Sequence, residues 1–226
     1  MTSQSLAKTA PAVQSKPVAR APAKPKGERT RERILDLAYD SVIRKGFAAT
    51  SIEELVEAAG ITKSGFFYHF KDKTDLARQL IARYTSENAS FLDDMAKRAR
   101  ELSDDPLHSF LIFLKLYAEA MENVPDSHPG CFVATVTFQD QSFDREMRRL
   151  TVDSVMDWRG RFVGWLEEIA AVYPPRGKLA MADLADSILA FTYGGMTLAK
   201  ALDDNSAISR QAMMFRETVR LYFQPD

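Results

Sequence analysis

The 226-residue sequence has little cysteine and no long apolar run. Its single cysteine, Cys131, excludes an intrachain disulfide framework and fits a reducing compartment. No stretch approaches the roughly 20 consecutive apolar residues that a membrane-crossing helix needs. The N-terminal positive charges are not followed by an apolar run of about 7 to 15 residues, so we expect no secretory signal. These absences predict a cytoplasmic protein with no membrane partner.

The sequence also lacks the motifs of common enzyme classes. It has no HExxH zinc motif, no phosphate-binding glycine loop, no Gly-x-Ser-x-Gly and no cysteine pair for zinc. Its three histidines, His69, His108 and His128, form no recognised ligand or triad spacing. We therefore expect no catalytic residue, no metal and no cofactor. Turnover of a candidate effector would overturn this expectation.

The net charge of −1 is unevenly distributed along the chain. Met1 to Lys73 carry 13 Lys and Arg against 8 Asp and Glu, a net +5, whereas the remainder has a net −6. Residues 1–27 combine five basic residues and four prolines with alanines and serines, which predicts a disordered basic tail. Such a tail either adds phosphate or minor-groove contacts or is only a solubilising extension.

Residues 50–61 carry the pattern of a short helix followed by a tight turn. Thr50 followed by Glu53 predicts a capping box, in which hydroxyl and carboxylate satisfy backbone N–H groups at the helix start. Gly60 suits the left-handed position that ends a helix, and Ile61 can pack back onto it. The apolar residues expected on one face of this helix are Ile52, Leu55, Val56 and Ala59.

A second short helix is expected after this turn, with Thr62 as its cap. We expect Phe66, Phe67 and Phe70 to form its buried side. An earlier helix from Arg31 to Lys45 has apolar residues at three and four residue spacing, so the three helices are expected to share one small core. Any two helices joined by a glycine turn can imitate this pattern, and the pattern alone leaves that alternative open.

The succession of motifs across residues 29–84 resembles the TetR family of bacterial transcriptional regulators. An arginine-rich helix is followed by Lys45-Gly46-Phe47, Thr50-Ser51-Ile52, Ala58-Ala59-Gly60-Ile61 and the run from Gly65 to Lys73. The resemblance implies a DNA-binding helix-turn-helix, a helical region that binds a small-molecule effector, and a homodimer. Beyond residue 84 the resemblance rests only on length, helical content and layout.

Ten residues are the expected DNA contacts, and the expected partner is a double-stranded operator. Base or phosphate contacts are assigned to Lys63, Ser64, Tyr68 and His69. Positioning of the DNA backbone is assigned to Thr50, Thr62, Lys71 and Lys73. Contacts to phosphate or to the minor groove are assigned to Arg29 and Arg31.

A long helix is expected from Thr74 to Leu102, which contains no Gly or Pro and follows Asp72 as a cap. At about 1.5 Å per residue it would span roughly 40 Å and join the two parts of the molecule. The family resemblance implies that such a helix acts as a lever between effector and DNA. A plain structural connector has the same sequence pattern.

The second half of the chain, from a helix start at Asp105-Pro106 onward, is rich in Phe, Trp and Met. Such side chains at helical spacing usually form a core, but they can also line a cavity. Gly160 and Gly164 are expected to leave space beside bulky neighbours. We hypothesise a pocket for a small apolar or electrophilic effector, lined by some of Phe110, Phe113, Leu114, Tyr117, Cys131, Phe132, Thr135, Trp158, Phe162 and Trp165.

Cys131 has two interpretations. A buried cysteine is commonly an inert apolar residue. Gly130-Cys131 also resembles a motif of one TetR subgroup, in which a cysteine near a helix start senses electrophiles or oxidants, and a helix N-terminus lowers the pKa of a thiol. Derepression by an electrophile that survives Cys131→Ser would assign this residue to packing.

Two helices near the C-terminus carry long apolar seams, which predict a four-helix interface between two copies. Gly194-Gly195 either permits close helix approach there or marks a kink. If all these faces were instead buried within one chain, the protein would be a monomer. The predicted interface residues are Leu184, Ile188, Phe191, Gly195, Leu198, Leu202, Ile208, Ala212, Phe215, Val219 and Tyr222.

The expected fold class is all-α, with an N-terminal three-helix DNA-binding domain and a larger C-terminal helical domain for ligand binding and dimerisation. The expected boundaries are 1–27 for the tail, 28–73 for the helix-turn-helix domain and 74–226 for the second domain. The predicted function is that of a homodimeric repressor released from a palindromic operator by the effector. The alternatives are an effector-independent architectural DNA binder and an all-helical enzyme.

Overall fold

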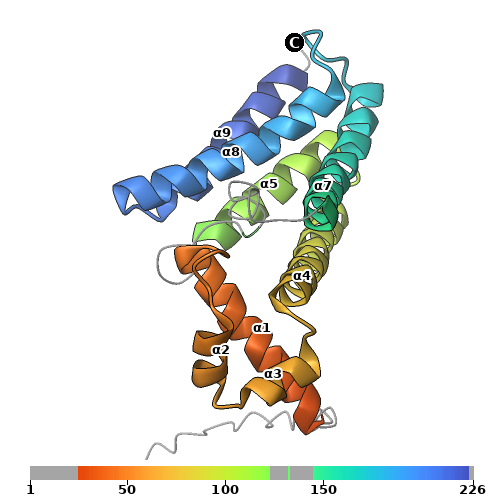
Figure 1. The fold of residues 1–226 in the computed structure, drawn as a ribbon. Coiled ribbons are helices and arrows are strands. Elements are labelled where there is room, and N and C mark those ends of the chain that lie inside the picture. The colour runs from red at the N-terminus through yellow and green to blue at the C-terminus, as the bar shows by residue number, and fades with distance from the viewer. Residues whose placement is uncertain (1–24, 123–131, 133–144, 224–226) are drawn as a thin grey trace, which may run out of the picture.

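The computed structural model describes residues 25–122, 132 and 145–223, and every regular element in these ranges is a helix. The predicted all-α fold class is confirmed. At one end of the molecule lie α1 (Lys26–Lys45), α2 (Ile52–Ala59) and α3 (Lys63–His69), as Figure 1 shows. The predicted supporting helix therefore begins five residues earlier than its expected start at Arg31.

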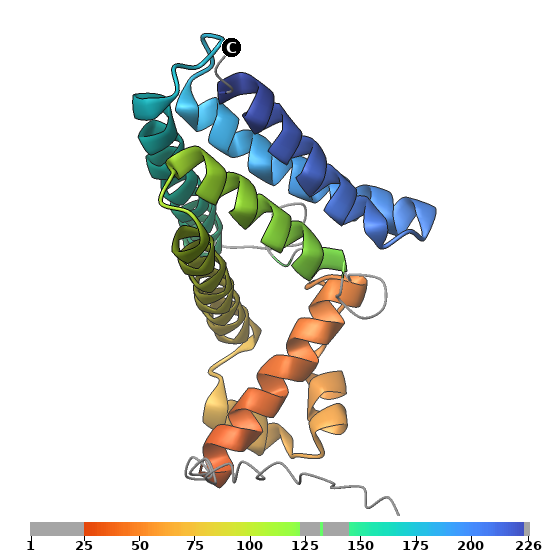
Figure 2. The same cartoon turned by 180° about the vertical axis from the view of Figure 1, so that it is seen from behind.

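The long helix α4 (Lys73–Leu102) leads away from this three-helix group toward the other helices. These are α5 (Pro106–Glu122), α7 (Arg145–Val172), α8 (Met181–Leu202) and α9 (Ser206–Phe223). In both views α8 and α9 run side by side at the end opposite α1–α3 (Figures 1 and 2). In the described part of the chain no helix is long and apolar enough to span a membrane.

The starts of α4 and α5 follow from side-chain caps. The Asp72 carboxylate accepts a hydrogen bond from the Asp75 backbone N–H at 2.7 Å, and Asp105 accepts one from the His108 N–H at 2.7 Å. Each cap satisfies an N–H group that has no partner within the first helical turn. Both predicted caps are confirmed, and α4 begins at Lys73, one residue before the predicted Thr74.

Buried apolar side chains form two main clusters. One joins α1–α3 to the first three turns of α4 and to Phe132 and Met147. The other lies between the far half of α4 and helices α5, α7, α8 and α9. Because α4 contributes side chains to both clusters, it connects the packing of the three-helix group with that of the other helices.

The predicted seams of α8 and α9 face mainly inward. Leu184, Ile188, Gly195, Ile208, Ala212, Phe215 and Val219 are buried within the subunit, and Phe191 and Tyr222 are partly buried. Of the eleven predicted interface residues, only Leu198 and Leu202 are exposed, by 40% and 63%. The prediction was wrong for the inward-facing residues because α8 and α9 pack on each other and on the helices beneath them.

Gly195 is required where α8 crosses α9. A Cβ atom at this position would lie 2.9 Å from the Ile208 Cα atom, closer than real Cβ contacts come, whereas one at Gly160 on α7 would meet nothing. We expect Gly195→Ala to lower the free energy of unfolding by about 1 to 2 kcal/mol through overpacking. The control Gly160→Ala should raise it by up to about 1 kcal/mol through helix propensity.

Urea denaturation of both variants measures this difference. Equal effects of the two substitutions would show that the α8–α9 crossing tolerates a side chain.

Candidate DNA-binding surface and central cavity

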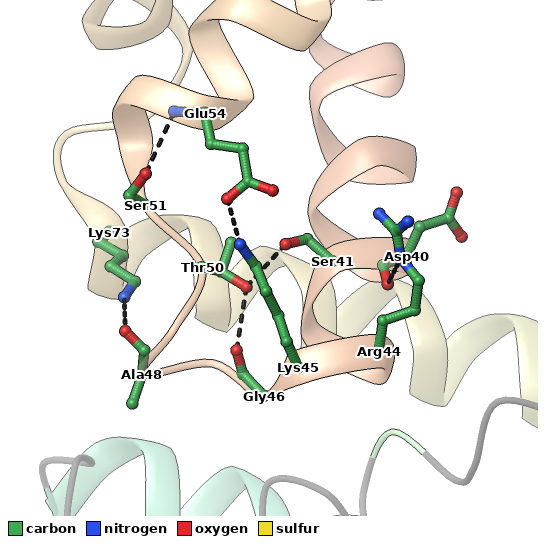
Figure 3. Close-up of polar contacts among 10 residues, drawn as sticks. All are labelled: Asp40, Ser41, Arg44, Lys45, Gly46, Ala48, Thr50, Ser51, Glu54 and Lys73. Atoms are coloured by element: carbon green, nitrogen blue, oxygen red, sulfur yellow. Dashed lines mark hydrogen bonds and ion pairs between the residues drawn. The ribbon is translucent and has the colours of Figure 1, made fainter.

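The start of α2 differs from the predicted capping box. Ser51 is the cap, and its hydroxyl accepts a hydrogen bond from the Glu54 N–H at 3.2 Å. Thr50 is only 1% exposed; its hydroxyl donates to the Gly46 carbonyl and lies 3.0 Å from the Ser41 hydroxyl, as Figure 3 shows. The side chain of Thr50 therefore stabilises the loop between α1 and α2 and does not reach a phosphate.

The turn between α2 and α3 has the predicted form. Gly60 adopts the left-handed conformation with φ 62°, and the Ile61 N–H donates to the Val56 carbonyl at 3.1 Å. The Thr62 hydroxyl then accepts a hydrogen bond from the Gly65 N–H at 3.1 Å, which starts α3. These caps hold a helix of only seven residues in a fixed direction.

Helix α3 presents one buried and one exposed side. Phe66 and Phe70 are 0% and 1% exposed, whereas Tyr68 is 81% exposed with its ring against His69. Phe67 is 50% exposed, so the prediction that it would be buried was wrong. Phe67 lies one turn after Lys63 on the same helix face, and this spacing is the signal that could have placed it beside the candidate contacts.

Lys63 is held beside α2 by an ion pair. Its ammonium lies 2.6 Å from the Glu53 carboxylate, and both side chains are more than half exposed. The hydrogen bond from Lys63 lowers the pKa of Glu53. Because the pair is solvated, a phosphate can compete with Glu53 for this ammonium. Ser64, the next residue of α3, is exposed.

The remaining predicted contacts fall into two groups. Arg31 donates to the Gln79 side chain and lies 6.0 Å above the Phe70 ring, so it joins α1 to α4. Lys73 donates to the Ala48 carbonyl at 3.3 Å, and burial, followed by the nearby Lys45 charge, lowers its pKa. Arg29 and Lys71 are exposed. Arg31 and Lys73 thus make internal contacts that a DNA phosphate would have to replace.

A cavity of about 540 Å³ lies among α1, α4, α5, α7 and α8. It is built by the facing sides of five helices, four of which (α4, α5, α7 and α8) also enclose the second apolar cluster. Its wall includes Asp36, Tyr39, Asp40, Arg83, Tyr84, Glu87, Phe91, Leu92, Tyr117, Met121, Asp157, Trp158, Arg161, Leu189, Thr192, Tyr193 and Met196.

Of the predicted pocket residues that the structure describes, Tyr117 and Trp158 line this cavity. The others that are described pack elsewhere: Phe110, Phe113, Leu114, Phe162 and Trp165 fill the second apolar cluster, and Phe132 stacks on Tyr39 in the first. The prediction was wrong for these six because their rings pack on neighbouring side chains. Cys131 and Thr135 lie outside the described residues.

The two mid-helix glycines do not create the cavity. Gly160 and Gly164 are exposed, and no atom lies within 4 Å of a Cβ built on either. Within residues 25–122 and 145–223, no group of three His, Cys, Asp or Glu side chains could hold a metal ion.

A family model described as bacterial regulatory proteins of the tetR family matches residues 34–80. The chain is 30% identical over 129 residues to the uncharacterized HTH-type regulator YvkB of Bacillus subtilis, which covers 55% of this chain and 65% of that protein. It is 27% identical over 177 residues to the HTH-type transcriptional repressor BepR of Brucella suis, covering 76% of this chain and 80% of the repressor. The chain thus spans less than two thirds of the Bacillus relative.

Solved structures share the fold. A TetR-family regulator from Agrobacterium tumefaciens superposes with a TM-score of 0.72 at 20% identity over 85% of this chain and 98% of the other. One from Chloroflexus aurantiacus gives 0.72 at 20% identity over 87% and 97%. This family and fold are those of transcriptional regulators and not of enzymes. The capped helix-turn-helix and the family model place residues 34–80 in the TetR family of bacterial transcriptional regulators, and the described chain shares the fold of solved structures of that family.

Proposed function

We propose that the protein is a homodimeric, DNA-binding repressor that a small molecule bound in the cavity releases from its operator. The observation that carries this proposal is the exposed side of α3, where Tyr68 stands 81% exposed on a helix whose other side is locked in the core. Members of the TetR family bind DNA operators and small-molecule effectors as dimers, which supports the proposal.

In this proposal α3 enters the major groove. Tyr68 and Ser64 reach base edges, Phe67 contacts a thymine methyl group or the sugar, and Lys63 binds phosphate. His69, Thr62, Lys71 and Arg29 contact the flanking backbone. Thr50 supports the unit from inside, and Lys73 and Arg31 position its helices.

The proposed dimer surface is the outward side of α8 and α9. Leu198 and Leu202 on α8 and Met213, Met214 and Leu221 on α9 are exposed apolar side chains. Gly194 and its helical neighbours Ala190 and Thr197 keep the outward side of α8 small and uncharged. A second copy can therefore approach closely and bury this surface, and a two-fold pair then presents both α3 helices to successive half-sites.

The cavity is the proposed effector site. Asp36, Tyr39 and Asp40 place α1 directly in its wall, while Ile34, Leu35 and Ala38 of the same helix pack in the core under α2 and α3. A ligand in the cavity thus contacts the helix on which the DNA-binding unit is built. Occupancy is expected to change the separation of the two α3 helices in the dimer.

The ion pair between Lys63 and Glu53 leads to a measurable effect on DNA affinity. We expect Glu53→Gln to strengthen binding about threefold at low salt, because Lys63 no longer has to leave a carboxylate to meet a phosphate. Glu57→Gln removes the same charge from α2 and serves as the control, because Glu57 forms no ion pair with any described residue. The gain from Glu53→Gln should exceed that from the control and fade as salt rises. Equal gains would show that the pair does not compete with DNA.

Release of DNA tests the effector part of the proposal. The protein is bound to DNA from its own upstream region at fixed moderate salt, and fluorescence anisotropy follows the complex as small molecules are added. Loss of the complex at saturating ligand supports the proposal. Specific binding that no compound relieves would contradict ligand release, and binding without sequence preference would favour the architectural alternative.

A further inference from the structure

The cavity wall combines many aromatic rings with several carboxylates. The rings belong to Tyr39, Tyr84, Phe91, Tyr117, Trp158 and Tyr193, which come from α1, α4, α5, α7 and α8. The carboxylates are those of Asp36, Asp40, Glu87 and Asp157, and the cations are Arg83 and Arg161. Negative side chains therefore outnumber positive ones in the wall.

Both arginines of the wall are already neutralised by carboxylates. Arg83 lies 2.7 Å from Asp36 and 2.7 Å from Glu87, and the hydrogen bond to Glu87 is the main cause that raises its pKa. Arg161 pairs with Asp93. An anionic ligand would thus share either guanidinium with a protein carboxylate, even at the buried Arg83 Nη1, which has no hydrogen-bond partner among the described residues.

Two carboxylates of the wall are different. Asp40 on α1 and Asp157 on α7 have no hydrogen-bond or ion-pair partner for their side-chain oxygens among the described residues. Arg44 contacts only the backbone carbonyl of Asp40. These two side chains leave the wall with negative charge that the protein does not itself compensate.

We propose that the ligand class of this cavity is an aromatic organic cation. This proposal rests on the proposed function, in which the cavity is the effector site. Aromatic faces attract a cation through their quadrupoles, and unpaired carboxylates attract it by Coulomb forces that neither a neutral nor an anionic ligand of the same shape receives. A volume of about 540 Å³ accommodates a ligand of drug size. The cationic class replaces the apolar or electrophilic effector expected from the sequence.

Three probes of nearly the same shape test the charge preference with the full-length protein and no DNA. They are N-methylacridinium, acridine at a mildly alkaline pH where it is uncharged, and acridine carboxylate. We expect the cation to bind about tenfold more tightly than acridine, and the anion to bind most weakly. Quenching of tryptophan fluorescence, with calorimetry as a second readout, measures the three dissociation constants.

Substitutions of the two unpaired carboxylates test whether they cause the preference for a cation. Asp40→Asn combined with Asp157→Asn should lower the affinity for N-methylacridinium several-fold and leave that for acridine unchanged. Asp94→Asn on α4, exposed and outside the wall, is the control and should alter neither. Equal or tighter binding of acridine or its carboxylate, or no binding of any probe, would overturn the proposal. Cation binding that leaves the operator complex intact would support the ligand class and contradict only the release mechanism.

Discussion

A variant with Met214→Glu and Leu221→Glu is expected to be a folded monomer that binds the operator at least about a hundredfold more weakly than the native protein. Both side chains are about half exposed on α9, so their replacement costs the subunit little burial. In the proposed dimer each substitution occurs twice, and the new carboxylates would lie buried and unpaired across the two-fold axis. Loss of the second α3 removes the avidity that links two half-sites.

Sedimentation and operator titration measure the two effects together. The matched control is Val152→Glu with Met156→Glu, an equally exposed apolar pair on α7 away from the proposed interface. The control should remain a dimer and retain operator affinity. A dimeric α9 variant with native affinity would place the interface elsewhere.

Tyr68→Ala is expected to weaken operator binding about tenfold per subunit, and hence about a hundredfold for the dimer. The tyrosine ring is 81% exposed and packs against its neighbour His69, so its removal leaves the core of the three-helix group intact. Thermal unfolding and the dimer should therefore be unchanged. Because a base contact is lost, affinity for nonspecific DNA should fall much less than affinity for the operator.

Fluorescence anisotropy with operator and scrambled duplexes measures the affinity of the variant for specific and for nonspecific DNA. Leu102→Ala, at an exposed position at the far end of α4, is the control and should leave both affinities unchanged. If Tyr68→Ala retained native operator affinity, α3 would not read the DNA through this side chain.

Features set by neighbouring residues could be predicted from the sequence. The caps at Thr62, Asp72 and Asp105 and the left-handed Gly60 depend on a few adjacent residues, and all were predicted. Thr50 was predicted as the cap of α2, whereas Ser51 is the cap, because both residues carry a hydroxyl next to the helix start. The Thr50 hydroxyl instead contacts Ser41 on α1 and the Gly46 carbonyl after it, and these contacts are not visible in the local sequence pattern.

Features set by packing between distant helices could not be predicted. Phe110 and Trp165 have the spacing and chemistry of pocket residues, but their ring centroids lie 5.0 Å apart within the core. Likewise, the seams of α8 and α9 are periodic whether they face a partner or the same chain. Acidic wall residues such as Asp40 give no signal along the chain, because the cavity brings them together from separate helices.

A footprint of the full-length protein on its own upstream DNA, at fixed moderate salt, shows whether a dimer binds an operator. We expect one sharply protected region made of two symmetric half-sites, about one helical turn or more apart, with contacts in successive major grooves. Protection should disappear in both the Tyr68→Ala and the Met214→Glu/Leu221→Glu variants. Diffuse protection that follows concentration and salt, without a two-fold pattern, would contradict a dimeric operator-binding regulator.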